Sequence, residues 1–293
     1  MRITNGIIQR SALANLQLNM RRILEAQEQA TSGKRIRAAS DDPIGASQVM
    51  QADGSLRALD QYKRNIASAT ARVNAEEGVL DRLTELLDRA KELGISQAGS
   101  NASAATRLTT KAEVDQLLAA AVQLGNQRHE GEYLFGGSQS TTAPFQTASP
   151  PFAAAPPTGT RTTEISASQY LATNHNGTEV FLDSNVLDAL SQLSTALGAN
   201  DLPGIQTALG ALDSAHDAVQ NLFGDVGARS SQLEVTSSNL VALDTQLRSF
   251  KSVIEDVDME HALTELVSRQ TAYQAAMLSM SRVMGLNLAD YLT

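Results

Sequence analysis

The sequence contains neither cysteine nor tryptophan. Without cysteine, the chain cannot form disulfides, thiolate metal sites or a cysteine nucleophile. Phe and Tyr make up only 4% of the residues, while alanine, leucine, glutamine and serine are abundant. This composition is typical of long packed helices. At 293 residues the chain is long enough for two domains and a sizeable core.

Long uninterrupted apolar runs are also absent. Polar residues, among them Arg10, Asn15 and Asn19, interrupt the first 25 residues, which therefore do not resemble the apolar segment of a secretory signal peptide. No run approaches the ~18 apolar residues of a membrane span, and a net charge of −9 argues against binding along a nucleic-acid backbone. We expect no membrane and no nucleic-acid partner. These features indicate a cytoplasmic protein, unless export leaves no cleaved signal.

Residue patterns for catalysis or metal binding are missing as well. The four histidines are scattered, and none has the spacing of a metal-binding motif. No glycine-rich phosphate loop is present. The acid pairs Asp41-Asp42 and Asp256/Asp258 lie at predicted helix starts, where negative charge meets the positive end of the helix dipole. We therefore expect no enzyme, no cofactor and no catalytic or metal site.

What the sequence does contain is a helical stripe at each end. Apolar residues there recur at alternating steps of four and three, which places one stripe along a helix and requires a partner helix to cover it. The N-terminal set is Leu13, Leu16, Met20, Ile23, Gln27 and Ala30; the C-terminal set is Met259, Leu263, Leu266, Gln270, Tyr273, Met277, Met280 and Met284. Ten of these residues form the predicted assembly seam: Leu13, Leu16, Met20, Ile23, Leu263, Leu266, Tyr273, Met277, Met280 and Met284. We expect the two terminal helices to pair as a coiled coil.

The charges of the two ends are opposite in sign. Residues 1–40 carry seven Lys/Arg and two Glu, whereas residues 251–293 carry three Lys/Arg and six Asp/Glu. The resulting balances of +5 and −3 favour pairing and register, although exposed ion pairs contribute only about 0–1 kcal/mol each. Solvated helix faces without a pairing role are the alternative interpretation.

Between the ends, the sequence predicts a bundle of long helices. A first helix should end at Ser32-Gly33, and a second should run from Pro43 to about Leu93. The helix cap and turn motif consists of Ser40, Asp41, Asp42 and Pro43: Asp42 suits the N-cap, and Pro43 suits the first helical position. Later in the chain, apolar residues recur every seven positions, at Ile205, Leu212, Val219, Val226, Leu233, Leu240, Leu247 and Ile254.

The heptad register changes once, within Glu255–Asp258. Continuing the earlier repeat would place His261 on the apolar line, whereas the observed line passes through Met259 and Leu263. The register therefore slips by two residues, or roughly 200° around a helix. We interpret Asp256 and Asp258 as a joint between two helical layers, with Asp258 capping the new segment.

The segment 133–183 has a different character. It holds six of the eleven Phe/Tyr residues and five of the seven prolines. Pro150-Pro151 and Pro156-Pro157 cannot continue a helix, and the composition favours short strands and loops. We expect a small inserted domain, with a disordered Ala/Pro/Thr loop as the alternative.

The predicted fold class is therefore mostly α: a long-helix bundle with paired terminal helices forming a coiled coil, plus a small inserted β/irregular domain. The expected division has three layers. The terminal coiled coil comprises 1–33 and 258–293, the helical bundle comprises 34–132 and 184–257, and the outer inserted domain comprises 133–183.

Several short motifs, occurring in order along the chain, resemble the flagellins. They are Met1-Arg2-Ile3-Thr4, Ser32-Gly33-Lys34-Arg35-Ile36, Ser40-Asp41-Asp42-Pro43, Gly131-Glu132-Tyr133-Leu134-Phe135-Gly136-Gly137, Pro144-Phe145 and Asn287-Leu288-Ala289-Asp290-Tyr291-Leu292. The likeness covers both termini and the bundle but not the inserted segment. Filament flagellins usually carry Ala after the paired Asp and end in Leu-Leu. Pro43 and Asp290-Tyr291-Leu292 depart from that pattern and resemble the family members that join hook to filament.

The resemblance implies a structural adaptor of the bacterial flagellum. It implies export through the flagellar type III apparatus without a cleaved signal peptide, and a secreted, extracellular location. The implied partners are copies of the chain in a ring, a neighbouring hook-associated protein, flagellin filament subunits, and a cytoplasmic export chaperone on the C-terminal helix. Two alternatives stay open at this point: a small filament-forming flagellin, and a non-flagellar coiled-coil scaffold or secreted effector.

Overall fold

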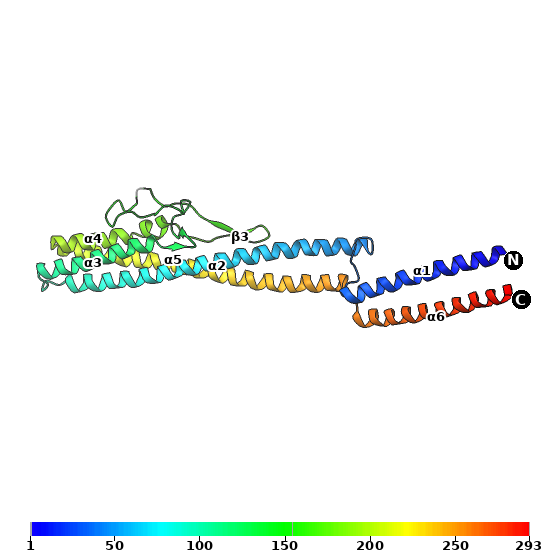
Figure 1. Ribbon diagram of the computed structural model, residues 1–293. Coiled ribbons are helices and arrows are strands. Elements are labelled where there is room, and N and C mark those ends of the chain that lie inside the picture. The colour runs from blue at the N-terminus through cyan, green and yellow to red at the C-terminus, as the bar shows by residue number, and fades with distance from the viewer. Residues whose placement is uncertain (1, 154, 293) are drawn as a thin grey trace. The chain divides into compact units, whose positions relative to one another are not determined.

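The computed structural model describes residues 2–153 and 155–292, with side chains described for residue 7 and for residues 10–153 and 155–281 (Figure 1). The α-helices are α1 (Arg2–Ser32), α2 (Pro43–Gln97), α3 (Ala104–Gly125), α4 (Val186–Ala199), α5 (Leu202–Glu255) and α6 (Met259–Leu292). The strands are β1 (Arg128–His129), β2 (Glu132–Tyr133), β3 (Thr162–Ser166) and β4 (Gln169–Ala172), followed by a π-helix, η1 (Thr178–Asp183). The predicted mostly helical fold with a small β insert is confirmed. None of the described helices is long and apolar enough to cross a membrane.

The chain divides into two compact units. The first comprises the residues up to Arg57 together with those from Leu243 onward, and the second comprises Ala58–Ala242. These limits differ from the predicted layers, because α2 and α5 each contribute to both units and the segment 133–183 belongs to the second unit. Helix α1 does end just before residue 33, and α6 does begin just after residue 258. The three-layer division stays a prediction.

In the second unit, α2, α3, α4 and α5 pack around an aliphatic core (Figure 1). The part of the heptad line that lies in this unit is buried as predicted, with its residues at most 5% exposed: Ile205, Leu212, Val219, Val226, Leu233 and Leu240. From α2 come Leu59, Ile66, Val73, Leu80, Leu83 and Leu87, which are also buried. Because both helices present an unbroken apolar stripe, the hydrophobic effect holds them side by side along the unit.

Gly94 does not end α2, contrary to the prediction that the helix stops near Leu93. The helix continues to Gln97 because the bare backbone of Gly94 makes room for neighbouring leucines. A Cβ at position 94 would lie 2.7 Å from the side chain of Leu209 on α5 and 3.4 Å from that of Leu193 on α4. This glycine therefore serves close packing rather than a turn.

A buried arginine closes the end of the bundle at which α2 and α4 terminate. Arg107 on α3 donates from Nε to the carbonyl oxygen of Gln97 (3.2 Å) and from Nη2 to that of Gly99 (2.9 Å). Its Nη1 donates to the side-chain oxygen of Asn200, which follows α4 in the left-handed conformation. Carbonyl oxygens at helix C-termini lack partners within the helix, so one guanidinium satisfies acceptors from two chain segments.

The inserted segment is an ordered part of the second unit. β1 pairs with β2, and β3 pairs with β4, both antiparallel, with Thr163 opposite Leu171 in the second hairpin. Phe181 packs edge-on against Phe135 and Phe145, at centroid distances of 5.3 and 5.2 Å. All three rings are buried. This aromatic cluster argues against the disordered-loop alternative for the described part of the segment.

Candidate assembly surface

The terminal helices α1 and α6 lie side by side and antiparallel in the first unit (Figure 1). The less exposed positions among the described side chains of α1 include Ala12, Leu16, Asn19, Ile23 and Ala26, and those of α6 include Ala262, Leu266, Arg269, Tyr273, Ala276 and Met280. Both sets follow the 4–3 alternation of a helix pair. Arg269 adds a direct link by donating from Nη1 to the carbonyl oxygen of Arg22 (2.9 Å).

This contact includes five of the ten residues of the predicted seam. They are Leu16, Ile23, Leu266, Tyr273 and Met280. Leu13, Leu263 and Met277 each follow directly after an alanine of the contact, at 12, 262 and 276, and Met20 follows Asn19. One residue corresponds to about 100° of rotation. Small side chains let two helices approach closely, whereas the larger neighbours point outward.

Four large side chains of the predicted seam, Leu13, Met20, Leu263 and Met277, are exposed in the single chain. Leu13 is 52% exposed and Leu263 is 49% exposed. They belong to a set that we call the uncovered apolar surface: Ile7, Leu13, Leu18, Met20 and Leu24 of α1, with Met259, Leu263, Val267, Met277 and Leu278 of α6. The side chain of Met284 lies outside the described residues. The assembly role of the seam residues stays a prediction.

The chain crosses from α1 to α2, and from α5 to α6, through two adjoining segments. The amide of Val257 donates to the carbonyl oxygen of Gly33 (2.9 Å), and the amide of Arg35 donates to that of Glu255 (2.7 Å). Gly33 adopts φ +69°, a conformation that favours glycine. The buried carboxylate of Glu255 pairs with Lys34 and with Lys251, the latter at 3.4 Å. These hydrogen bonds and ion pairs hold the α1–α2 and α5–α6 connecting segments together.

The motif Ser40-Asp41-Asp42-Pro43 forms the turn that starts α2. Oδ1 of Asp42 accepts the amide hydrogen of Gly45 (2.9 Å), which is the geometry of an N-cap, and Pro43 is the first helical residue. Oδ2 of Asp41 accepts the amides of Arg37 (3.1 Å) and Ala38 (3.0 Å). The Gly45 amide lowers the pKa of Asp42, and the Ala38 amide lowers the pKa of Asp41. Ser40 donates a long hydrogen bond from Oγ to Oδ1 of Asp41 (3.4 Å).

Replacing Asp42 with alanine should lower the melting temperature by a few degrees, because the amide of Gly45 loses its acceptor. Thermal unfolding followed by circular dichroism measures this effect. The matched control is Asp42→Asn, since asparagine caps helices equally well but carries no charge. An equal loss of stability in both variants would indicate that the ion pair with Arg35 matters and that the cap does not.

The two aspartates of the predicted joint have different roles. Oδ1 of Asp258 accepts the amide hydrogens of Glu260 (3.0 Å) and His261 (3.3 Å), so it caps α6. Asp256 accepts a hydrogen bond from the hydroxyl of Ser252 (2.5 Å) and bridges backbone to backbone with Lys34. Neither aspartate takes part in a metal cluster, since no three His, Asp or Glu of the described residues could hold a metal ion together.

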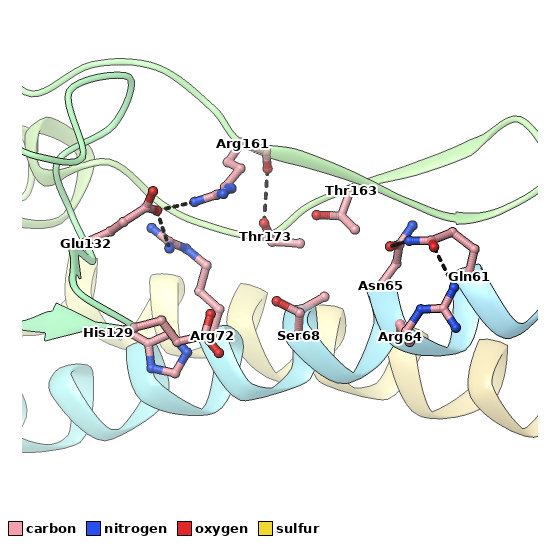
Figure 2. A pocket seen from close by; sticks show the side chains of 12 residues that line it. Gln61, Arg64, Asn65, Ser68, Arg72, His129, Glu132, Arg161, Thr163 and Thr173 are labelled. Atoms are coloured by element: carbon pink, nitrogen blue, oxygen red, sulfur yellow. Dashed lines mark hydrogen bonds and ion pairs between the residues drawn. The ribbon is translucent and has the colours of Figure 1, made fainter.

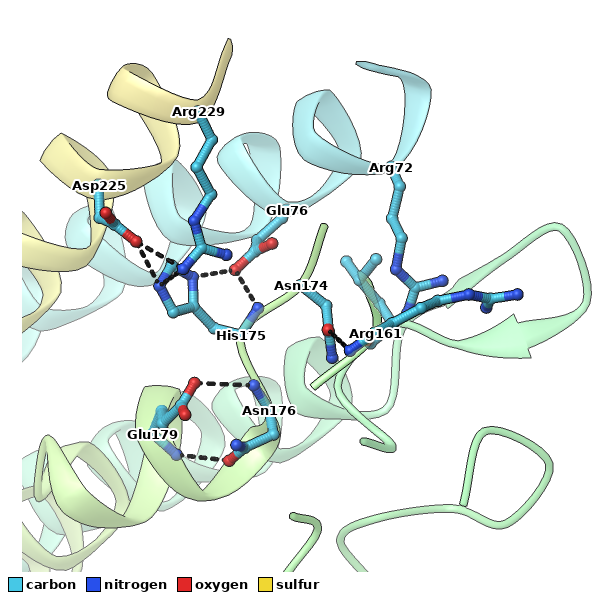
Figure 3. A network of polar contacts seen from close by, with 10 residues as sticks. Arg72, Glu76, Arg161, Asn174, His175, Asn176, Glu179, Asp225 and Arg229 are labelled. Atoms are coloured by element: carbon cyan, nitrogen blue, oxygen red, sulfur yellow. Dashed lines mark hydrogen bonds and ion pairs between the residues drawn. The ribbon is translucent and has the colours of Figure 1, made fainter. Parts of the chain in front are cut away.

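A buried polar network in the second unit was not foreseen from the sequence (Figure 3). His175, in the loop after β4, approaches Glu76 of α2 through Nδ1 (2.6 Å) and Asp225 of α5 through Nε2 (2.9 Å). Arg229 lies 3.0 Å from the same Nε2 and pairs with Asp225 at 2.6 Å. The network ties the inserted segment to two helices of the bundle.

The ionisation of His175 should make stability depend on pH. Burial lowers the pKa of His175, but its hydrogen bond to Glu76 and the charges of Glu76 and Asp225 outweigh burial and raise the pKa above 6.5. A raised pKa means that the folded chain holds the proton more tightly than the unfolded chain does. The stabilisation is therefore complete below the unfolded value and is lost as pH rises through the folded value.

We accordingly expect the free energy of unfolding to fall from slightly acid to alkaline pH, and this slope to shrink in His175→Gln. Denaturant titrations of both chains over that range measure the slope. His261→Gln, which alters an exposed histidine of α6, is the control and should keep the original slope. If the His175→Gln slope equals that of the unaltered chain, another group is responsible.

An antiparallel pair of terminal helices with uncovered apolar residues, together with a helical bundle bearing a small insert, defines a subunit of a protein polymer. Residues 3–140 match the bacterial flagellin N-terminal helical region, and residues 209–292 match the bacterial flagellin C-terminal helical region. Together these matches span well over half of the sequence. The chain belongs to the bacterial flagellin family, a family of structural components of the flagellum, as its motifs predicted.

Individual relatives are similar over nearly the whole chain. Flagellar hook-associated protein 3 of Escherichia coli strain K12 is 26% identical over 93% of this chain and 96% of that protein. The flagellin of Halalkalibacterium halodurans is 25% identical over 96% of this chain and 94% of that flagellin. The crystal structure of the flagellar junction protein FlgL from Legionella pneumophila has a similar fold, with a TM-score of 0.58 and 14% identity over 70% of this chain and 100% of that chain.

Proposed function

We propose that this chain is the adaptor that joins hook to filament, and that α1 and α6 form its attachment surface. The observation that carries the proposal is the uncovered apolar surface of these two helices. Family membership supports a flagellar role, and the near-full-length similarity to hook-associated protein 3 supports the junction. Pro43 and the ending Asp290-Tyr291-Leu292 support it further.

The uncovered apolar surface explains why the terminal helices need a partner. Burying one large apolar side chain completely stabilises an assembly by about 1.5–3 kcal/mol. A single pair of helices is marginally stable in water without further packing. Contacts between copies in a ring would cover residues such as Leu13, Met20, Leu263 and Met277, which the single chain leaves exposed.

The same surface suggests the remaining partners. A hook-associated protein would contact one side of the ring, and flagellin subunits would contact the other. Before export, a cytoplasmic chaperone would cover α6, which otherwise exposes Leu263, Val267, Met277 and Leu278. Export through the flagellar type III apparatus without a cleaved signal would bring the chain to its extracellular position.

A deletion strain tests the junction role. Without the chain, cells should still make hooks but should release flagellin into the medium, as electron microscopy and immunoblotting of the medium would show. Reintroducing the gene should restore filaments. Cells that keep filaments after the deletion would rule out the junction role.

A filament-forming flagellin is the second candidate, favoured by the 25% identity to the flagellin of Halalkalibacterium halodurans. The number of copies separates the two functions. A junction adaptor should be present as a ring or so per flagellum, whereas a filament subunit should be present in thousands. Quantitative mass spectrometry of purified flagella gives that number. Family membership leaves no support for a non-flagellar scaffold or effector.

A further inference from the structure

A polar pocket lies between α2 and the inserted segment, within the second unit (Figure 2). Its volume is about 450 Å³, within the range of small-molecule sites. One wall is the face of α2 that carries Arg64, Ser68 and Arg72. Glu132 of β2 and the β3–β4 hairpin, with Thr163, form the other side. The pocket is independent of the terminal helices and of the junction role.

Cationic charge exceeds anionic charge in this pocket. Three arginines line it, Arg64, Arg72 and Arg161, against two carboxylates, Glu130 and Glu132. Figure 2 shows Arg72 and Arg161 pointing toward the same carboxylate. Arg161 donates from Nη1 to Oε2 of Glu132, and Nη1 of Arg72 lies 4.0 Å from that oxygen. Two guanidinium groups therefore share one counter-ion.

Arg72 is a buried cation with one unused hydrogen-bond donor. It is 7% exposed, and Nη2 donates to the carbonyl oxygen of Leu134 (2.9 Å). Its Nε is among the described buried atoms that lack a hydrogen-bond partner, as is Nε2 of His129, another residue of the pocket wall. Burial, followed by the positive charge of Arg161, lowers the pKa of Arg72. A guanidinium that shares its ion-pair partner with a second arginine can be stabilised by a further anion.

The rest of the lining is rich in hydroxyl and amide groups. Ser68, Thr163 and Thr173 supply hydroxyls, Gln61 and Asn65 supply amides, and Ala69 is the apolar member of the lining. Hydroxyls both donate and accept hydrogen bonds, which suits a ligand that bears hydroxyl groups of its own. An apolar ligand would find almost no matching surface.

We propose that this pocket binds a sugar acid, that is, a small hydroxyl-rich molecule with one carboxylate. The carboxylate lies against the guanidinium groups of Arg161 and Arg72, where planar paired hydrogen bonds can form. The sugar hydroxyls face Ser68 and Thr163. Arg64, at the exposed rim, adds a third cation.

Isothermal titration calorimetry of the full chain with D-glucuronate, at low ionic strength, tests the proposal. We expect saturable binding of glucuronate that is at least about tenfold tighter than binding of neutral D-glucose. Arg161→Ala should weaken binding by about tenfold or more, because the ligand loses a charged donor and meets Glu132 uncompensated. Arg64→Ala should weaken it less. Arg82→Ala, an exposed arginine of α2 outside the pocket, should leave binding unchanged.

Three results would overturn the assignment. The first is the absence of saturable glucuronate binding to the unaltered chain. The second is binding that Arg161→Ala leaves intact while the variant remains folded by circular dichroism, since the ligand would then sit elsewhere. The third is inorganic sulfate binding as tightly as glucuronate, which would mean that the pocket selects charge without recognising the hydroxyls.

Discussion

Leu263→Asp should abolish filament attachment while leaving the isolated chain folded. Leu263 is half exposed on α6 in the single chain, so its replacement should change the free energy of unfolding by no more than about 0.5 kcal/mol. In the assembled flagellum, the proposed contacts between copies bury this position. An unpaired carboxylate buried there would cost several kcal/mol at every copy of a ring.

The measurement combines two assays of one variant. Complementation of the deletion strain, followed by counting filaments in electron micrographs, reports attachment, and a thermal melt of the purified protein reports folding. Ser268→Asp places the same charge at an exposed polar position of the same helix, and it should support normal filaments. Normal filament growth with Leu263→Asp would show that this residue stays in water after assembly.

Phe181→Ala should destabilise the second unit by about 3–5 kcal/mol. Its ring is fully buried and makes edge-on contacts with Phe135 and Phe145. The alanine variant would leave a cavity beneath the inserted segment and remove both ring contacts. Because natural domains are stable by only about 5–15 kcal/mol, much of the margin should be lost.

Denaturant unfolding followed by circular dichroism measures this loss. Tyr170→Ala is the matched control, since this aromatic residue of β4 is 63% exposed and its removal should cost little. Similar losses in the two variants would show that the aromatic cluster contributes little. The inserted segment would then be held mainly by its polar links, such as His175 with Glu76.

Long regular helices were predictable from the sequence because their pattern repeats many times. The seven-residue spacing of α5 identified its buried line from Ile205 to Leu240 without exception. The N-cap at Asp42 was also predictable from the sequence, since capping depends on a few adjacent residues. Where local hydrogen bonding or long periodicity decides the structure, the sequence alone was sufficient to predict it.

The terminal helices show what the apolar pattern leaves open. The contact between α1 and α6 includes large residues of the pattern, such as Ile23 and Leu266, but also Ala26 and Ala262, which the pattern did not contain. A helix with two neighbouring apolar stripes does not indicate which one faces its partner within the chain. That choice depends on the geometry of both helices and on the other surfaces present.

The network around His175 could not be predicted for a different reason. Its members Glu76 and His175 are 99 residues apart, and His175 and Asp225 are separated by 50 more. His175 lies in a loop without periodicity. The packing of the inserted segment on α2 and α5 brings these residues together. No short sequence pattern around them indicates this packing.

The hydrogen bonds around Arg107 have a consequence for stability in acid. All three acceptors of this guanidinium are uncharged amide oxygens, from Gln97, Gly99 and Asn200. Ion pairs with Asp or Glu weaken when acid neutralises the carboxylate, whereas a neutral amide oxygen keeps its ability to accept a hydrogen bond under mildly acidic conditions. This end of the bundle should consequently stay intact under acidic conditions that weaken carboxylate-dependent contacts elsewhere in the second unit.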